Sequence, residues 1–266
     1  MKNLINLFAA ILFMAMSMSL VAQTPELIPY RKGDKWGYCD RNKKILITPK
    51  YEDANPFSEG LARVYLNGKW GFINEYGKLV IPCKYDDAWY FSEGLVKVQF
   101  NGKWGLINKD GKVITPCIYD NAGDFSEGLA WVRFNGKWGF INEYGKLVIP
   151  CKYDDAWYFS EGLVKVQFNG KWGLINKDGK VITPCIYDDV EDFKEGLAKV
   201  KLNDKYGFIN KDGKLVIPCK YDFAGSFSEG LASVKLNGKV GFINKDGKLV
   251  IPCKYDFAWD FSEGLA

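Results

Sequence analysis

The chain repeats one motif of 34 residues seven times without an insertion, and this period constrains the fold more than any other feature. A fixed period of this size is typical of a tandem array in which each unit packs against its neighbours. Tryptophan or a substitute, followed by glycine, marks the motif at Trp36, Trp70, Trp104, Trp138, Trp172, Tyr206 and Val240. The units begin near Lys35, Lys69, Lys103, Lys137, Lys171, Lys205 and Lys239.

Turn signals within each unit predict β-strands. In one unit, residues 95–100 alternate between polar and apolar types and lead into Asn101-Gly102, a strong hairpin signal because both turn residues need positive φ. Residues 104–108 and 113–115 are the next two strands, and Pro116 ends the third. The recurring turns leave no room for helices of about 12 residues. The sequence therefore predicts an all-β chain of three-stranded antiparallel meanders, each followed by a longer loop.

The two-residue turn also predicts the strand register, which pairs Val98 with Gly105. We expect one face to form a dry core and the other to be mixed. The dry face carries Val96, Val98, Phe100 and Ile107, and the mixed face carries Lys97, Gln99, Trp104 and Leu106. A recurring mid-strand glycine indicates close approach by another backbone or a large ring. We expect loop aromatics such as Tyr119 and Phe125 to fill that space.

One unit has too few large apolar side chains to offset the entropy of ordering its chain, so the units must stack. We expect an open, twisted stack of seven meanders, because propeller blades usually contain four strands in about 40–45 residues. A closed, propeller-like ring is the alternative.

The ends of the chain carry separate predictions. Residues 1–22 combine Lys2 with an apolar run and small residues, which is typical of a secretory signal peptide that forms a helix. Residues 23–266 are then the array, with no membrane span in the mature chain. We expect export to the periplasm, the medium or the cell surface. The net charge of +4 is too small for a nucleic-acid binder of this length.

The motif resembles the bacterial WG (KWG) repeat. The resemblance is carried by residues 69–74 (KWGFIN), Gly77, residues 80–82 (VIP), Tyr85-Asp86 and residues 91–95 (FSEGL). It implies a β-rich array in bacterial, often exported, proteins and no enzymatic activity. The chain departs from the WG-repeat motif in two ways. Cysteine follows proline in six units, and Tyr206 and Val240 stand where the other units have the tryptophan of the Trp-Gly pair.

Residues 69–120 are identical to 137–188, which indicates recent duplication or gene conversion. The sequence stops at Leu265-Ala266, two residues into what would be the first strand of an eighth unit. We expect the natural protein to continue beyond this point. Closure of a ring, with residues 27–32 supplying a missing strand, is the competing explanation.

The polar residues predict no catalytic, metal or cofactor site. Histidine is absent, so the usual hydrolytic triads are excluded and only paired carboxylates such as Asp86-Asp87 and Asp154-Asp155 remain. Glutamate recurs in every unit, whereas a catalytic pair is needed once, so we expect these side chains to accept backbone hydrogen bonds. The glutamates are Glu59, Glu93, Glu127, Glu161, Glu195, Glu229 and Glu263. The turn at residues 108–111 has too few oxygen ligands for calcium and is interpreted as structural.

Six cysteines recur at the array spacing, with Cys39 apart. Equivalent positions in stacked sheets should lie about 10 Å apart, beyond disulfide reach. We therefore interpret Cys83, Cys117, Cys151, Cys185, Cys219 and Cys253 as buried small apolar residues.

Aromatic residues supply the functional hypothesis. The tryptophans of the Trp-Gly pairs are expected to pack between units. Aromatic residues of the long loops vary between units, which suits contact with a partner on a regular scaffold. The candidate partner-binding residues are Trp89, Tyr90, Trp157, Tyr158 and Trp259. The sequence thus predicts a non-enzymatic exported scaffold that mediates protein–protein interaction, with carbohydrate or cell-wall binding as the alternative.

Overall fold

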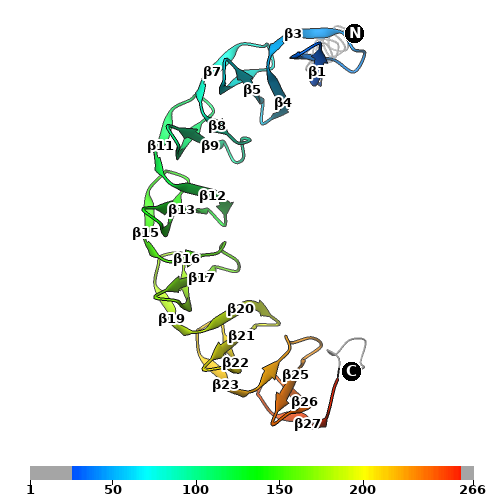
Figure 1. The fold of residues 1–266 in the computed structure, drawn as a ribbon, viewed down its shortest axis with the longest axis vertical. Helices are drawn as coiled ribbons and strands as arrows, with labels where there is room; N and C mark the ends of the chain where they lie inside the picture. Colours follow the sequence, from blue (N-terminus) through cyan, green and yellow to red (C-terminus); the bar gives the residue numbers. More distant parts are fainter. Residues whose placement is uncertain (1–25, 259–266) are drawn as a thin grey trace, which may run out of the picture.

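The computed structural model describes residues 26–258, which form a row of seven antiparallel sheets arranged as an open arc (Figure 1). The described residues contain no helix, and hence none that is long and apolar enough to cross a membrane. The prediction of an all-β, open tandem array is confirmed. The predicted signal peptide and its helix, residues 1–22, lie outside the described residues, as do Trp259 and Glu263.

Within the described residues, six sheets contain four strands and the sheet nearest the N-terminus contains three. The first strands are β4 (Asp53–Ser58), β8 (Asp87–Ala88), β12 (Asn121–Ser126), β16 (Asp155–Ala156), β20 (Asp189–Lys194) and β24 (Phe223–Ala224). The second strands are β1 (Ile28–Lys32), β5 (Leu61–Leu66), β9 (Leu95–Phe100), β13 (Leu129–Phe134), β17 (Leu163–Phe168), β21 (Leu197–Leu202) and β25 (Leu231–Leu236). The third strands are β2 (Lys35–Cys39), β6 (Lys69–Asn74), β10 (Lys103–Asn108), β14 (Lys137–Asn142), β18 (Lys171–Asn176), β22 (Lys205–Asn210) and β26 (Lys239–Asn244). The last strands are β3 (Ile45–Tyr51), β7 (Leu79–Tyr85), β11 (Val113–Tyr119), β15 (Leu147–Tyr153), β19 (Val181–Tyr187), β23 (Leu215–Tyr221) and β27 (Leu249–Tyr255).

The predicted three-stranded meander is present in each unit, but the prediction missed a strand. The extra strand comes from the start of the long loop and pairs with the second strand, as in Ala88 opposite Val98. It is only two residues long in β8, β16 and β24, too short for an alternating pattern to reveal it. A buried alanine such as Ala88 marks it, because a small side chain lets the preceding sheet approach.

The predicted register between the second and third strands is confirmed. Val98 lies opposite Gly105 and Lys97 opposite Leu106. Asn101 has φ 52° and Gly102 has φ 75°, the left-handed conformations that a type I′ turn requires.

The recurring Trp-Gly glycine faces a bulge in the last strand. Three residues of β11, from Pro116 to residue 118, lie opposite the single residue Gly105. A Cβ on Gly105 would lie 2.6 Å from the carbonyl oxygen of Thr115 and 2.8 Å from the nitrogen of Cys117. The predicted close backbone approach is therefore confirmed, whereas the expectation that Tyr119 and Phe125 fill this space is wrong. Proline suits the bulge because its missing N–H is not needed there.

Within residues 26–258 the hydrophobic core is divided into six clusters, one at each boundary between successive sheets. Between the second and third sheets, Phe72 and Ile81 pack against Val96, Val98 and Ile107. Between the third and fourth sheets, Leu106 packs with Val132 and Ile141. Each inner sheet therefore buries both faces.

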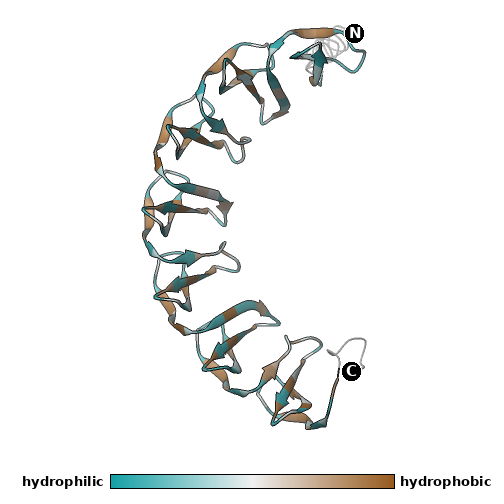
Figure 2. Ribbon diagram, in the orientation of Figure 1, coloured by the Kyte–Doolittle hydropathy of each residue, from teal (hydrophilic) through white to brown (hydrophobic). Residues whose placement is uncertain are grey.

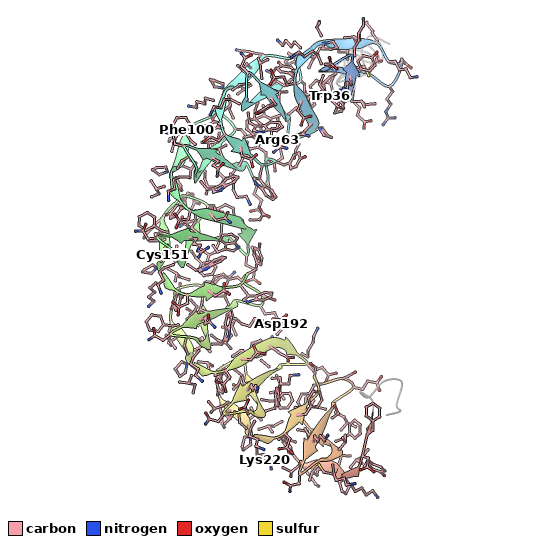
Figure 3. The ribbon with its side chains drawn as sticks, in the orientation of Figure 1. Trp36, Arg63, Phe100, Cys151, Asp192 and Lys220 are labelled. Atoms are coloured by element: carbon pink, nitrogen blue, oxygen red, sulfur yellow. The ribbon has the colours of Figure 1, made fainter. Side chains whose placement is uncertain are left out.

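Burial of both faces corrects the prediction of one dry and one mixed face. Leu106 and Lys97, assigned to the mixed face, are 2% and 8% exposed. Phe100, assigned to the dry face, is 42% exposed because it adjoins the hairpin tip on the convex rim of the arc (Figure 3). The hairpin tips face outward, and the last strands cross to the next sheet along this rim, where Figure 2 shows apolar segments.

Candidate binding site

Two loops with the same sequence, residues 89–94 and 157–162, project from the concave rim of the arc (Figure 1). In the first loop, the amide of Trp89 donates to the carbonyl of Lys97 at 3.0 Å. Ser92 and Leu95 then close a tight turn through two backbone hydrogen bonds. Phe91 is 3% exposed and its ring centre lies 5.0 Å from that of Phe72 in the preceding sheet. The loop is thus anchored, which fixes the position of its outward side chains.

The candidate residues of these loops are exposed. Trp89 and Tyr90 are each 48% exposed, and Trp157 and Tyr158 are 54% and 51% exposed. In the seventh sheet, the equivalent positions hold Gly225 and Ser226, so that loop has no aromatic pair. The concave rim therefore presents two aromatic pairs at positions separated by two sheets within residues 26–258.

Each exposed indole stands over a lysine that forms an ion pair with the next sheet. The ammonium of Lys97 lies 4.2 Å from the centre of the Trp89 ring and 2.6 Å from the carboxylate of Asp124. The Lys97 side chain is 10% exposed, whereas that of Asp124 is 69% exposed. In the second pair, Lys165 lies 4.6 Å from the Trp157 ring and 2.8 Å from Asp192.

A pocket opens beside each indole, between one sheet and the next. The pocket at Trp89 has a volume of about 340 Å³ and is closed on the far side by residues 123–125. The pocket at Trp157 has a volume of about 370 Å³, and residues 191–194 form its far side. Asp192 lies on the concave side in Figure 3. The aromatic walls are the same, but the second pocket adds Glu161, Glu191 and Lys194.

The tyrosines of the two loops line the pockets and also contact the preceding sheet. The Arg63 guanidinium lies 5.1 Å from the Tyr90 ring and 4.0 Å from the Trp70 ring, and it donates to Asn55 Oδ1 at 2.7 Å. At the equivalent place two sheets further on, Trp131 replaces Arg63, and its ring centre lies 6.5 Å from that of Tyr158. Tyr90 and Tyr158 therefore help to hold neighbouring sheets together.

The tryptophans of the Trp-Gly pairs pack at the boundaries between sheets, as predicted. They are half-buried, and each contacts one of the core clusters. They do not line the two pockets.

The predicted role of the recurring glutamates is confirmed at three positions, Glu59, Glu127 and Glu195. Each carboxylate accepts a hydrogen bond from a glycine amide of the next sheet, at 3.0, 3.0 and 3.1 Å. Each also pairs with a lysine of that sheet, at 2.9 to 3.0 Å. The lysine is the main reason that the pKa of each carboxyl lies below its ordinary value.

The paired aspartates are also engaged in the scaffold. Asp86 pairs with Lys69 and accepts a hydrogen bond from the amide of Gly102 at 3.2 Å. These contacts, the lysine first, lower the pKa of Asp86. Asp87 accepts a hydrogen bond from the amide of Ala88 at 2.8 Å. Asp154 and Asp155 repeat both arrangements with Lys137 and Ala156.

The turn at residues 108–111 is structural, as predicted. Asn108 Oδ1 accepts hydrogen bonds from the amides of Asp110 and Lys112, at 3.1 and 2.9 Å. Within the described part of the chain, no three metal-ligating side chains come together.

The cysteines are free thiols, and the six repeated ones are half-buried, which corrects the prediction that they are buried. Cys39 is buried. The Sγ atom of Cys117 lies 3.7 Å from the carbonyl oxygen of Val98, and burial raises the pKa of this thiol. Cys151, one of the six repeated cysteines, lies on the convex rim in Figure 3.

The sequence model of the WG containing repeat matches the chain at residues 36–70, 70–104, 104–138, 138–172, 172–206, 206–239 and 241–266. The chain belongs to the WG-repeat family. A search of curated proteins finds no match to this WG-repeat chain.

Several solved structures are similar to the WG-repeat chain at low scores. A eukaryotic initiation factor has a TM-score of 0.41 and 12% identity, with 85% of this chain and 73% of that chain covered. Hsv2p from Kluyveromyces lactis has a TM-score of 0.34 and 12% identity, with 71% and 72% covered. The CNH domain of AfRom2 has a TM-score of 0.32 and 10% identity, with 80% and 88% covered. None of these likenesses carries an argument about function.

Sequence reasoning found the exposed indoles but missed the other wall of each pocket. Asp124 and Asp192 belong to the next repeat, and the sequence does not show which face of a loop meets it. The available signal was the variation at one repeat position, which holds Arg63, Lys97, Trp131, Lys165, Lys199 and Ser233. It indicates that the boundaries between sheets are not all alike.

Proposed function

We propose that this WG-repeat protein is a non-enzymatic binding scaffold that holds a macromolecular partner against its concave rim. The observation that carries this proposal is the presence of two rigidly held, exposed aromatic pairs in equivalent places on a regular arc. Anchored aromatic side chains give a large contact area at a small entropy cost. Repeat arrays commonly use an extended concave surface for binding, so a protein is the first candidate partner.

The absence of catalysis is part of the proposal. The carboxylates that could act as acid and base are paired with lysines, as in Asp86 with Lys69 and Asp154 with Lys137. The same arrangement recurs along the array, whereas a catalytic pair belongs in one differentiated pocket. Turnover of any substrate that is lost on replacing Asp86 or Asp154 would contradict this part.

A glycan is the second candidate partner, and the chemistry of the pockets favours it. Each pocket combines an exposed indole with an ion pair whose carboxylate is open to solvent. Such a wall offers an aromatic face for stacking and ion-paired carboxylates that accept hydrogen bonds.

Export remains part of the proposal and is supported by the composition of residues 1–22. Mass spectrometry of the mature N-terminus from the native cell checks it, and an intact Met1 in the cytosol would contradict it.

The binding proposal is tested by comparing three forms of the full chain as baits against the native envelope fraction. The first is the natural chain and the second carries Trp89→Ala and Trp157→Ala. The third carries Tyr76→Ala and Tyr144→Ala, which remove aromatic side chains that are 85% and 78% exposed outside the pockets. We expect one partner to be retained by the first and third forms and lost from the second. Equal retention by all three forms, or retention of neither a protein nor a glycan by any form, would refute the proposal.

A further inference from the structure

We propose that the pockets at Trp89 and Trp157 are two subsites for one neutral polysaccharide chain, with a sugar ring stacked on each indole. This inference rests on the proposed function and names its partner. It is carried by the environment of each indole, the charge of each pocket and the repetition of the pocket along the array.

One face of each indole is already occupied. Lys97 lies 4.2 Å from the Trp89 ring centre and Lys165 lies 4.6 Å from the Trp157 ring centre. These lysines belong to β9 and β17, which are central strands, so they fix the rings against a rigid surface. About half of each indole stays exposed. A flat apolar ligand face can stack there without reordering the loop, which lowers the entropy cost of binding.

The carboxylates that line the two pockets are ion-paired. In the second pocket Glu191 pairs with Lys199 and Glu161 with Lys211, and Lys194 is a further charged residue of its wall. Lys97 is neutralised by Asp124 and Lys165 by Asp192. A charged ligand would have to compete with these pairs, and separating a buried lysine from its partner is costly. A neutral ligand avoids that cost. The carboxylates of Asp124 and Asp192 are 69% and 77% exposed, so they can still accept hydrogen bonds from hydroxyl groups.

A neutral sugar ring meets both requirements, because it has an apolar C–H face and hydroxyl groups at its edge. The pockets hold about 340 and 370 Å³, near the lower end of the range for small-molecule sites. One or two sugar rings, rather than a whole oligosaccharide, therefore occupy each pocket.

The two pockets point to a polymer. Their aromatic loops belong to identical segments, residues 69–120 and 137–188, and the pockets lie two sheets apart. Stacked sheets are spaced by about 10 Å, so the pockets are separated by on the order of 20 Å. A disaccharide is too short to bridge them, whereas a polysaccharide reaches both. Binding at two linked sites increases the apparent affinity by about 10²–10⁴-fold when the geometry permits both contacts.

The test measures binding of the full chain to soluble dextran, laminarin and galactomannan, with heparin as the anionic comparison and matching disaccharides as short probes. The variants are Trp89→Ala, Trp157→Ala and the double variant. The matched control is Tyr76→Ala with Tyr144→Ala, and circular dichroism checks that every variant is folded. We expect the natural chain and the control to bind at least one neutral polysaccharide and to bind two disaccharides per chain.

Each single variant should bind one disaccharide and lose about 10²-fold or more in apparent affinity for the polymer. The double variant should bind neither. Heparin binding equal to or tighter than that of the neutral polymers, an unchanged double variant, or no binding to any neutral polymer would overturn the inference. If the double variant loses a protein from the envelope fraction while no neutral polymer binds, the glycan inference fails and the proposed function stands. If the double variant loses neither a protein nor a neutral polymer, the glycan inference and the proposed function both fail.

Discussion

The carboxylate of Glu59 in the second sheet accepts a hydrogen bond from the amide of Gly94 in the third sheet, at 3.0 Å. Lys109 of the third sheet approaches the same carboxylate at 2.9 Å. One side chain thus links two separate turns of the next repeat. Glu127 and Glu195 repeat the arrangement at alternate boundaries.

Glu127→Gln is expected to lower the free energy of unfolding. The substitution removes the charge that binds Lys177 and weakens the hydrogen bond from Gly162. Both side chains are about one-third to two-fifths exposed, so the loss should be about 1 kcal/mol. Chemical denaturation measures it. Glu93→Gln is the matched control, because Glu93 has the same φ of 53° and no ion pair with any described residue. An equal loss in both variants would contradict the prediction.

The same glutamates predict a dependence of stability on pH. The pKa of Glu59, Glu127 and Glu195 is lower in the folded chain than the ordinary value of 4.5. Their contribution is therefore fully present above pH 4.5 and is lost as the pH falls through the folded-state pKa. The midpoint of denaturation should fall on acidification below pH 4.5. A variant with glutamine in place of Glu59, Glu127 and Glu195 should show a smaller fall in the midpoint. If the midpoint of that variant depended on pH as strongly as that of the natural chain, the assignment would be contradicted.

Gly105→Ala is expected to destabilise the chain strongly. The new methyl group would lie 2.6 Å from a carbonyl oxygen of the neighbouring strand, and backbone cannot yield as a flexible side chain can. We expect a loss of about 3 kcal/mol from this overpacking. Gly102→Ala is the control, because Gly102 has φ 75° and no atom within 4 Å of an added Cβ. It should cost about 1–2 kcal/mol from backbone strain alone. A thermal melt that ranks the two variants in the opposite order would refute the bulge explanation.

The contrast between these two glycines shows how far the sequence could predict the fold. The Asn101-Gly102 turn is a local signal, and it fixed the register of β9 and β10 residue by residue. The bulge at Gly105 depends on a third strand, so only the existence of a close approach could be foreseen. Burial of Lys97 and Leu106 depends on the next sheet, which supplies Asp124 and Val132 as their neighbours. Local patterns therefore predicted each meander, while the boundaries that form the pockets needed the structure.

All seven cysteines are expected to titrate as free thiols when the chain is denatured without a reducing agent. In the folded chain, burial raises the pKa of Cys83, Cys117 and Cys151 above the ordinary value of 9.0. The thiolate is the reacting form, so the folded chain should react more slowly than the denatured chain at pH 8. The absorbance change during reaction with a thiol reagent measures both the number of free thiols and the rate at which they react. Fewer than seven thiols in the denatured chain would indicate disulfides.

A single excised repeat is expected to remain unfolded. In residues 87–119, Val96, Val98 and Ile107 face the second sheet, while Leu106 faces the fourth. Excision exposes both sets, and burying a few large apolar side chains within one sheet cannot offset the entropy of ordering the chain. The longer segment 53–153 keeps the boundaries on both sides of the same sheet, so it should melt cooperatively. Circular dichroism compares the two peptides, and a cooperative melt of residues 87–119 alone would show that the sheets do not depend on one another.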